Sequence, residues 1–562
     1  MKERYLHLME KALAAYSLEQ IDEYFARVQR EGLTEHGFAR LTANTGVLIA
    51  HGRRTDLKER FLAMMDFCCA TMPHVRAAND FTVREMITCI MALEEHAAVP
   101  AEKLTQWKNG LAQVVPEKTY NVWASHPEQE CYNWACFSAV SEFMRNRMGL
   151  GDNSEGIDTQ LATQLQWLDE NGMYHETGNP MVYDLVPRAL FAVLLHFGYR
   201  GRYAAALEAC LEKSIPCDLR MQSVSGEIPY GGRSAQFWHN EAWLSIVFEY
   251  AAARCAARGD AAGAALYKSR IDRALAHLEA GLDERPVRHV KNRFPTETGY
   301  GCEEYAYFDK YMITTASFLY VACLLCDEKA GAGVRPPAET AAVWQTSRFF
   351  HKVFAHAGGY TLEWDIDADA HYDCSGLGRV HKKGAPSPLC LSLSCTVNGN
   401  YKTDVENAVP LAICPGVKTT QGWRYATGAD TAYIVETLGA DPAADAARVT
   451  LKYSFADGQT VKSSYAVDAS GITVRVSGEG ELALLLPAFA FDGEVHPDIV
   501  CAPDAMYIAY RGWLCRYTAE NAVLADTGCL AANRNGHYRV FAAQGRNELT
   551  VRIVLEKDAA AE

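Results

Sequence analysis

A change of hydrophobic period near residue 335 is the feature that most constrains the fold of this chain. Before it, apolar residues recur every three or four positions, as in residues 40–50 and 81–93, and this spacing predicts amphipathic helices. After it, short β-branched segments alternate apolar and polar residues, as in 450–455 and 549–555. This alternation predicts antiparallel strands. The chain therefore divides into a helical half and a β half.

The two periods predict an α+β multidomain protein. We predict an N-terminal (α/α) helical toroid over residues 1–335, a linker over 336–345 and a C-terminal antiparallel β-sandwich over 346–562. A toroid of antiparallel helix pairs buries its apolar faces between an inner and an outer layer. The loops at one end of the inner helices then surround a concave site. The alternative is a plain helical bundle that carries a β module and has no chemistry of its own.

Charge and hydropathy exclude several classes of partner. The 562 residues include 54 Lys plus Arg and 69 Asp plus Glu, so the net charge is −15, which disfavours nucleic acid. No stretch approaches the roughly 20 apolar residues that span a bilayer, so we expect no membrane partner. The first residues enter an amphipathic pattern without the apolar core of a secretory signal, and we expect a cytoplasmic protein. A homo-oligomer is left open.

The distribution of cysteines agrees with the expected cytoplasmic location. The 18 Cys are spread through apolar segments, as is typical of small buried thiols in a reducing environment. The pair Cys323 and Cys326 has the spacing of a redox or zinc motif but no second Cys/His pair near it. We therefore predict no metal and no cofactor.

Four segments of the helical half are too polar for a core and too aromatic for a linker. Each mixes carboxylates, cations or amides with aromatic residues. Each comes just before, or at the start of, an apolar helical run, so we predict loops that lead into helix N-termini, where anions are favoured. The segments cover residues 132–134, 173–188, 226–241 and 291–311.

This mixture of side chains is suited to a saccharide. Aromatic planes pack on sugar rings, and polar side chains hydrogen-bond to hydroxyl groups. Basic residues gather in these loops although the chain is acidic, and the fork of an Arg side chain suits a carboxylate, so we predict a uronic-acid-containing saccharide or glucuronide as the ligand. The predicted substrate-binding residues are Arg233, Arg188, His239, Tyr307, Lys310, Glu303, Tyr183, Asn133, Trp134 and, in a basic loop of the β half at 372–384, Arg379 and His381.

Three carboxyl groups are the predicted catalytic residues. Glu304 is the first of them, and its spacing from Tyr307 and Tyr311 predicts one shared helical face. Asp184 and Glu241 head different helices and are expected to face a substrate from other sides. Glycoside hydrolysis needs two carboxyl groups, one acid and one base or nucleophile. The alternative for Asp184 and Glu241 is a role as helix caps or ion-pair partners.

The same segments also fit a uronate lyase. A lyase needs a cation or polar clamp on the substrate carboxylate and a Tyr or His that removes the C5 proton. His239 and Asn240 with Tyr307 or Tyr183 could supply these groups. The motifs do not separate hydrolysis from elimination, and a carbohydrate-binding protein without catalysis is a third class.

With these residues placed, the chain resembles carbohydrate-active enzymes built as an (α/α) toroid followed by an antiparallel β-sandwich. The likeness is concentrated in Asn133-Trp134, Tyr183–Arg188, Gly231–Glu241 and Gly301–Tyr311. It resembles the β-glucuronidases of glycoside hydrolase family 154, which implies removal of β-linked glucuronic acid.

Polysaccharide lyases of the heparinase and alginate-lyase type share this architecture and are the near alternative. Their paired Asn before the catalytic His is not seen here, because Trp238 precedes His239 and Asn240 follows it. This departure favours the hydrolase at the level of sequence.

Overall fold

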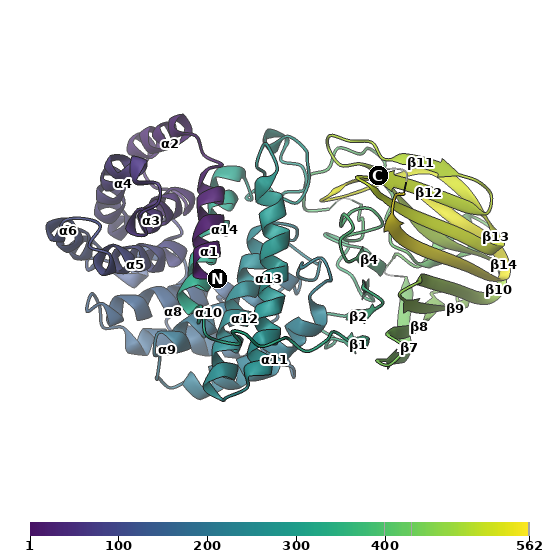
Figure 1. Ribbon diagram of the computed structural model, residues 1–562, viewed down its shortest axis with the longest axis horizontal. Helices are drawn as coiled ribbons and strands as arrows, with labels where there is room; N and C mark the ends of the chain where they lie inside the picture. The colour runs from purple at the N-terminus through teal and green to yellow at the C-terminus, as the bar shows by residue number, and fades with distance from the viewer. Residues whose placement is uncertain (398, 429, 560–562) are drawn as a thin grey trace.

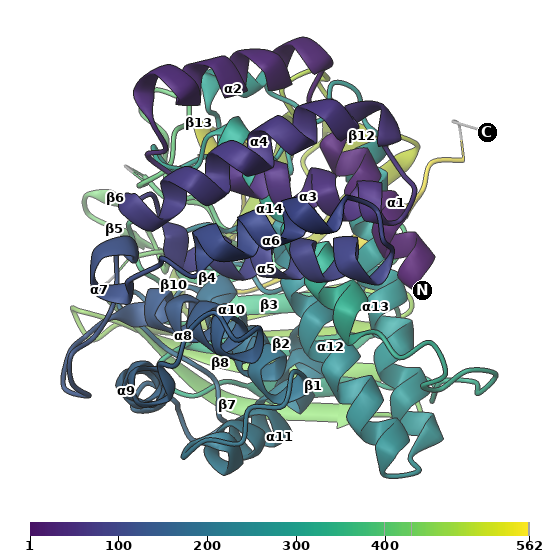
Figure 2. The same cartoon turned by 90° about the vertical axis from the view of Figure 1, so that its left-hand side faces the viewer.

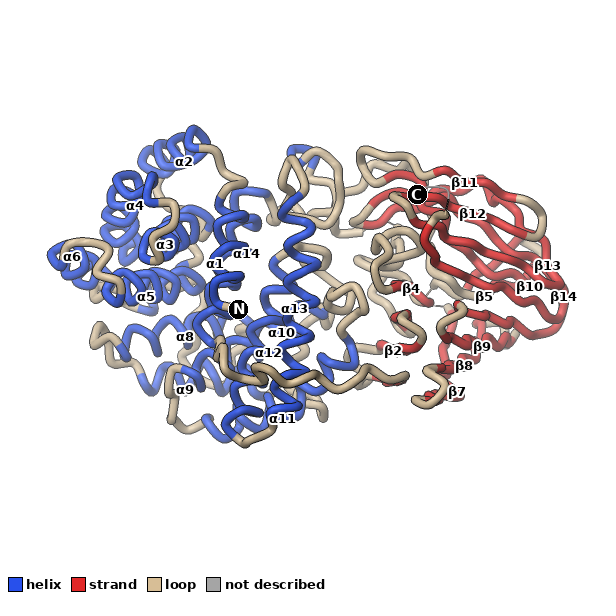
Figure 3. Tube along the Cα trace, in the orientation of Figure 1, coloured by secondary structure: helices blue, strands red, loops and turns tan. Residues whose placement is uncertain are grey.

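The helices and strands occupy separate halves of the molecule. The computed structural model describes residues 1–397, 399–428 and 430–559. Helices fill the first half and strands the second, as Figures 1 and 3 show. The predicted fold class, a helical toroid followed by an antiparallel β-sandwich, is confirmed.

Six of the described helices form a closed ring. Each of these six inner helices contacts the next inner helix along the chain, and the last inner helix contacts the first. These inner helices are buried on nearly every side, and α3 buries all of its residues, as expected for helices that are surrounded by other elements. The inner helices are α3 (Gly37–Ala50), α5 (Asn79–Glu95), α8 (Tyr132–Arg147), α10 (Met181–His196), α12 (His239–Ala257) and α14 (Phe308–Leu325).

A second layer of helices packs outside the ring. In Figure 2, α9, α11 and α13 lie to the outside of α8, α10 and α12. The outer helices are α1 (Lys2–Leu13), α4 (Lys58–Thr71), α6 (Ala101–Leu111), α9 (Ser154–Leu165), α11 (Ala204–Met221) and α13 (Ala261–Asp283). Helix α2 (Leu18–Glu31) and the short α7 (Pro116–Thr119) complete the half. Over the described part of the chain, no helix has the length and hydropathy needed to span a bilayer.

The β half contains two antiparallel sheets. The smaller sheet has the order β1-β2-β3-β4 and consists of β1 (Ala342–Gln345), β2 (Lys352–Ala357), β3 (Tyr360–Asp365) and β4 (Gly376–Lys382). The larger sheet has the order β11-β12-β13-β14-β10-β9-β8-β7, with β5 paired to β10 and β6 paired to β5. Its strands are β5 (Pro415–Thr419), β6 (Gly422–Tyr425), β7 (Thr431–Asp441), β8 (Ala446–Phe455), β9 (Thr460–Asp468), β10 (Gly471–Phe491), β11 (Asp498–Cys501), β12 (Ala505–Tyr510), β13 (Trp513–Asn533) and β14 (Gly536–Lys557).

The two sheets pack face to face on one apolar core. Strands β1 and β2 contact β7, β8 and β9 of the larger sheet. Trp364 of the smaller sheet meets Tyr465 of the larger one edge to face, with ring centroids 5.1 Å apart. Alternate residues along β8 and β9 are buried, as expected for strands with one face in a sandwich core.

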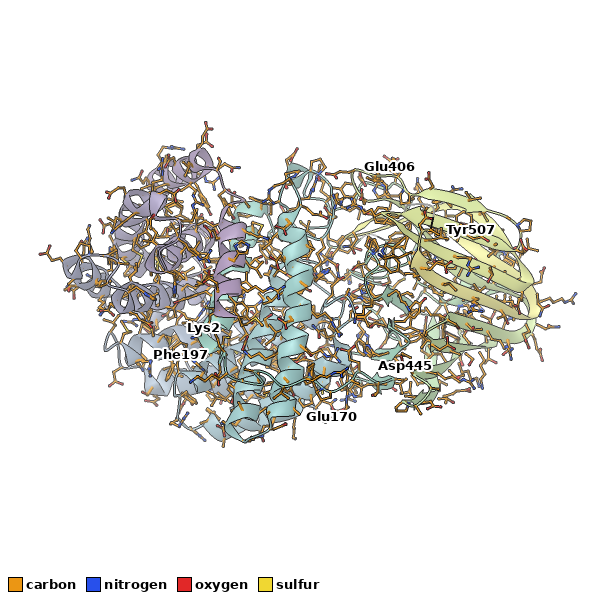
Figure 4. The ribbon with its side chains drawn as sticks, in the orientation of Figure 1. Lys2, Glu170, Phe197, Glu406, Asp445 and Tyr507 are labelled. Carbon is orange, nitrogen blue, oxygen red and sulfur yellow. The ribbon has the colours of Figure 1, made fainter. Side chains whose placement is uncertain are left out.

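The smaller sheet lies between the large sheet and the helical half. Its β4 reaches the helical half through Arg379, whose Nη1 donates a hydrogen bond to the Ile228 carbonyl oxygen at 2.7 Å. Asp373, just before β4, accepts a hydrogen bond from the Gly232 backbone N–H at 2.8 Å. Figure 4 shows side chains of both halves meeting along this junction. The β half therefore docks on the loops that precede the inner helices.

The boundary between the halves differs from the predicted one. Helix α14 ends at Leu325 and strand β1 begins at Ala342, so the connection starts earlier than residue 336, and the end of the predicted linker is a strand. Gly331, Gly333 and Pro336 disfavour a longer helix, and β1 pairs with β2 in register.

Candidate active site

A cavity lies where the six inner helices begin. Its volume is about 320 Å³, and side chains from the first turns of all six inner helices line it. Helix N-termini carry partial positive charge, so a ring of six favours an anion. The lining residues are His36, Arg40, Phe81, Asn133, Trp134, Phe137, Val182, Tyr183, Val186, Arg233, His239, Trp243, Tyr305, Lys310, Tyr311, Thr314 and Phe318. We call this space the ring cavity.

The apolar part of the ring cavity is built from aromatic rings. Trp243 of α12 and Phe318 of α14 have ring centroids 3.6 Å apart. Phe81 of α5 packs on Trp134 and Phe137 of α8 at centroid distances of 4.6 and 4.3 Å. Planar apolar surfaces of this kind suit the faces of sugar rings.

Hydroxyl and imidazole groups form the polar wall. The Ser234 hydroxyl hydrogen-bonds to the Tyr183 and Tyr305 hydroxyls, each at 3.1 Å. The rings of His239 and Tyr311 lie 5.4 Å apart by centroid. Burial and, next, the Arg40 guanidinium lower the pKa of His239 to about 3, and burial raises the pKa of Tyr311. His239 is thus a neutral imidazole and Tyr311 a protonated phenol at neutral pH.

Three cations line the ring cavity, and they differ in their partners. Arg40 Nε donates to the Glu85 carboxylate at 3.1 Å, and its Nη1 donates to Thr314. Arg233 is ion-paired with Glu176 and lies over the Tyr183 ring at 4.4 Å. Lys310 is half-buried and, among the described residues, has no hydrogen-bond or ion-pair partner for its ammonium group. Burial lowers the pKa of Lys310.

The carboxylates near the ring cavity do not line it but contact residues in or next to its wall. None of the described residues that line the ring cavity is Asp or Glu. Glu176 accepts hydrogen bonds from the Asn133 side chain at 3.1 and 3.2 Å and pairs with Arg233. Glu303 accepts from the Ser234 backbone N–H at 2.6 Å and from Arg534. Both carboxylates hold other groups of the site in place.

Two of the predicted catalytic carboxyls lie outside the cavity in buried ion pairs. Asp184 pairs with Arg188, which also contacts Asp218, and all three side chains are buried. Neither Asp184 nor Arg188 is among the residues that line the ring cavity. Arg188 instead forms an ion pair with Asp218 of the outer helix α11. Glu241 accepts a hydrogen bond from Lys291 at 2.7 Å and is fully buried. These placements match the ion-pair alternative for both carboxyls.

Glu304 and Tyr307 face a different space. Helix α14 begins at Phe308, so they precede the helix and do not share a helical face with Tyr311, contrary to the spacing argument. Both are exposed and line a larger hollow of about 950 Å³ with Glu297 and Glu303. The chain between Glu303 and Tyr311 therefore has this hollow on one side and the ring cavity on the other.

Arg379 and His381 are not part of a loop over the cavity mouth. Both lie in strand β4 and are buried. Arg379 pairs with Glu363 at 3.0 Å, and the His381 Nδ1 lies 2.7 Å from the Ser223 hydroxyl. The Gly-containing segment pairs with β3 as a strand with one register shift, between Glu363 and Trp364, and this pairing places both side chains in the junction between the halves.

The structure adds residues to the site that the sequence argument missed. His36 and Arg40 enter the ring cavity from α3, and Tyr305 and Tyr311 enter it from the last loop and α14. The available signal was a pair of basic residues four positions apart, with His36 just before a helix of mainly apolar and small residues and Arg40 in its first turn. No group of three or more His, Cys, Asp or Glu side chains placed to hold a metal ion occurs within residues 1–397, 399–428 and 430–559.

Comparisons with known proteins give weak likenesses of fold. No family model and no curated protein matches the chain. A heparinase III structure is 10% identical over 94% of this chain and 85% of its own, with a TM-score of 0.42. A heparan sulfate lyase mutant from Pedobacter heparinus is 9% identical over 84% and 76%, with a TM-score of 0.41.

A glycosyl hydrolase of family 88 from Bacteroides vulgatus is also similar. It is 10% identical over 58% of this chain and 98% of its own, with a TM-score of 0.36. Likenesses at this level place the chain in no family, and the resemblance to family 154 stays a prediction.

Proposed function

We propose that this protein is an enzyme that cleaves a uronic-acid-containing saccharide by β-elimination at the ring cavity. The observation that supports this proposal is the composition of the wall. The described lining residues include His, Tyr, Arg, Lys and Asn side chains but no Asp or Glu. Elimination needs a cation and a Tyr or His, whereas glycoside hydrolysis needs two carboxyl groups facing the substrate.

The charge of the site supports an acidic sugar. The six helix N-termini favour an anion. The ammonium group of Lys310 lies 5.7 Å from the Tyr307 ring centroid and has no hydrogen-bond or ion-pair partner among the described residues. Binding of the substrate carboxylate next to cations stabilises the carbanion-like charge that develops when the C5 proton leaves. Lys310 is therefore the proposed carboxylate contact, and Arg233 and Asn133, held by Glu176, are proposed to assist it.

The proton transfers are assigned to His239 and Tyr311. The neutral imidazole of His239 takes the C5 proton of the uronate. The electron pair of that C–H bond becomes the C4–C5 double bond, and the C4–O bond to the leaving sugar breaks. The Tyr311 phenol gives its proton to the leaving oxygen. Burial keeps the base neutral and the acid protonated before the reaction.

A glycoside hydrolase is the second candidate, favoured by the three carboxylates of the larger hollow. Glu297, Glu303 and Glu304 all line it. Under this alternative, Glu304 is the acid, and Glu304→Gln abolishes release of a poor leaving group. Under the elimination proposal, the same variant keeps its uronate cleavage.

One screen separates the candidates. The protein is incubated with uronate polymers and oligosaccharides and, in parallel, with chromogenic β-glucuronide, β-galacturonide and β-glucoside. The proposal predicts an ultraviolet band of an unsaturated uronate. Chromophore release without that band favours the hydrolase, and binding without either signal favours a carbohydrate-binding protein.

A further inference from the structure

Arg534 joins the β half to the wall of the ring cavity. It lies in the turn between β13 and β14, and its side chain is 1% exposed. Its Nη1 donates to Glu303 Oε2 at 3.0 Å and its Nη2 to Glu303 Oε1 at 2.7 Å. The same guanidinium donates to the Gly301 carbonyl oxygen at 2.8 Å and lies 4.2 Å from the Tyr401 ring centroid.

Glu303 connects Arg534 to residues next to the ring cavity. Its Oε1 also accepts a hydrogen bond from the Ser234 backbone N–H at 2.6 Å. The Ser234 hydroxyl in turn contacts the Tyr183 and Tyr305 hydroxyls, and both tyrosines line the ring cavity. Three successive hydrogen bonds therefore connect Arg534 with the tyrosines that line the ring cavity.

The loop that Glu303 holds has an unusual backbone. Gly231, Gly232, Ser234 and Gln236 all have positive φ, with 58° at Ser234 and 65° at Gln236. Residues other than Gly rarely adopt this region and persist there only when the surroundings hold them. The same β-hairpin also contacts the far end of the loop, because Asn535 donates to the Gln236 side-chain oxygen at 3.2 Å.

We propose that Arg534 is a positioning residue of the ring cavity, which holds residues 231–236 and their cavity-lining side chains in place through Glu303. The functional part of this inference rests on the proposed elimination activity. The structural part, that Arg534 holds residues 231–236 in place, does not rest on that activity, because it can be measured without a substrate.

A purely structural ion pair between the halves is the competing explanation, and the chain offers a matched control. Arg288 Nη2 donates to Glu494 in the β half at 2.6 Å, and Arg288 is also buried. Arg288 does not line the ring cavity. Arg534→Lys and Arg288→Lys each keep the charge and remove the forked geometry.

The experiment measures loop protection and turnover in both variants. Hydrogen–deuterium exchange is followed in peptides that cover residues 226–241, with peptides from α13 as an internal reference. Arg534→Lys is expected to speed exchange in that loop at least several-fold and to lower kcat about 10- to 100-fold with a smaller change in KM, because misplaced groups lose near-attack geometry. Arg288→Lys is expected to change neither the exchange of the loop nor kcat.

Unchanged exchange in Arg534→Lys, or equal changes in both variants, would overturn the proposal. The two parts of the inference can fail separately. If the wild-type protein does not cleave uronates but Arg534→Lys exchanges faster in the loop, the positioning role is supported and the proposed activity is refuted. If Arg534→Lys does not fold, Glu303→Gln tests the same link, since its amide oxygen still accepts one of the hydrogen bonds. Normal loop exchange in Glu303→Gln would then overturn the proposal.

Discussion

At the scale of single residues, the ring cavity separates side chains that act on a substrate from side chains that hold them. His239, Tyr311 and Lys310 line the space, whereas Glu176 and Glu303 lie behind it in ion pairs. A buried carboxylate whose oxygens are already bonded cannot also serve as a free acid or nucleophile. This distinction underlies the preference for elimination over hydrolysis.

Tyr311→Phe tests the proposed acid. The variant keeps the ring that packs on Phe237 at a centroid distance of 5.0 Å but loses the proton donor. Loss of a general acid typically costs about 10²–10⁴ in rate, and we expect a kcat decrease of that size with little change in thermal stability. Tyr307→Phe is the matched control, because Tyr307 faces the larger hollow, and it should keep at least half of the wild-type rate. A greater loss in Tyr307→Phe would move the chemistry to that hollow.

The pH dependence of kcat/KM tests His239. Its folded-state pKa is lowered to about 3 by burial and by Arg40, so the base form dominates at every pH well above that value. Activity due to this group should therefore be flat from pH 7 down to about pH 5 and fall only as the pH approaches 3. An ordinary histidine would lose activity near 6.5. An acid limb near pH 6.5 in the wild-type profile would contradict a buried, neutral base.

Lys310→Gln tests the carboxylate contact. Removing the cation should raise KM for a uronate substrate about 10- to 100-fold, since a charge-assisted hydrogen bond is worth about 1.5–3 kcal/mol. The matched control is Lys402→Gln, because Lys402 lines the larger hollow. Steady-state kinetics on the same oligosaccharide measures both. Equal KM changes would mean that Lys310 is not the specific contact.

At the scale of elements, each inner helix presents its first turn to the cavity, and the preceding loops bring the remaining groups. The 3.6-residue period predicted these helices because their apolar residues are regularly spaced. It could not predict which ends meet, since that depends on the closure of the ring by α14 against α3. For the same reason Asp184 heads an inner helix, as predicted, but points to Arg188 and not into the cavity.

The loop at 231–236 gives a prediction about stability. A Cβ added at Gly232 would lie 2.6 Å from the Pro180 Cβ at a φ of +74°, whereas one at Gly458, with φ +86°, would meet nothing within 4 Å. Gly458→Ala should cost about 1–2 kcal/mol through its left-handed backbone alone. Gly232→Ala should cost about 1–3 kcal/mol more because of the clash. Denaturant unfolding measures both, and equal costs would contradict the close packing of this loop against Pro180.

At the scale of the whole molecule, the β half packs against the loops that precede the inner helices, although none of the described residues that line the ring cavity comes from it. The change of hydrophobic period predicted its existence, because alternation over four to eight residues depends only on local sequence. It could not predict the docking contacts of Arg379, His381 and Arg534, which join residues that are 151, 158 and 231 positions apart in the chain. Arg379 and His381 were predicted to bind substrate from a loop, whereas β4 uses them to bind the helical half.

The most direct test of β-elimination is the mass of the products. A uronate oligosaccharide that the wild-type protein cleaves is digested in water enriched in heavy oxygen, and the fragments are weighed by mass spectrometry. Elimination predicts fragments whose masses sum to that of the substrate, one of them an unsaturated uronate, with no heavy oxygen incorporated during cleavage. Fragments that together exceed the substrate by one water, with heavy oxygen in one of them, would show hydrolysis and contradict this account.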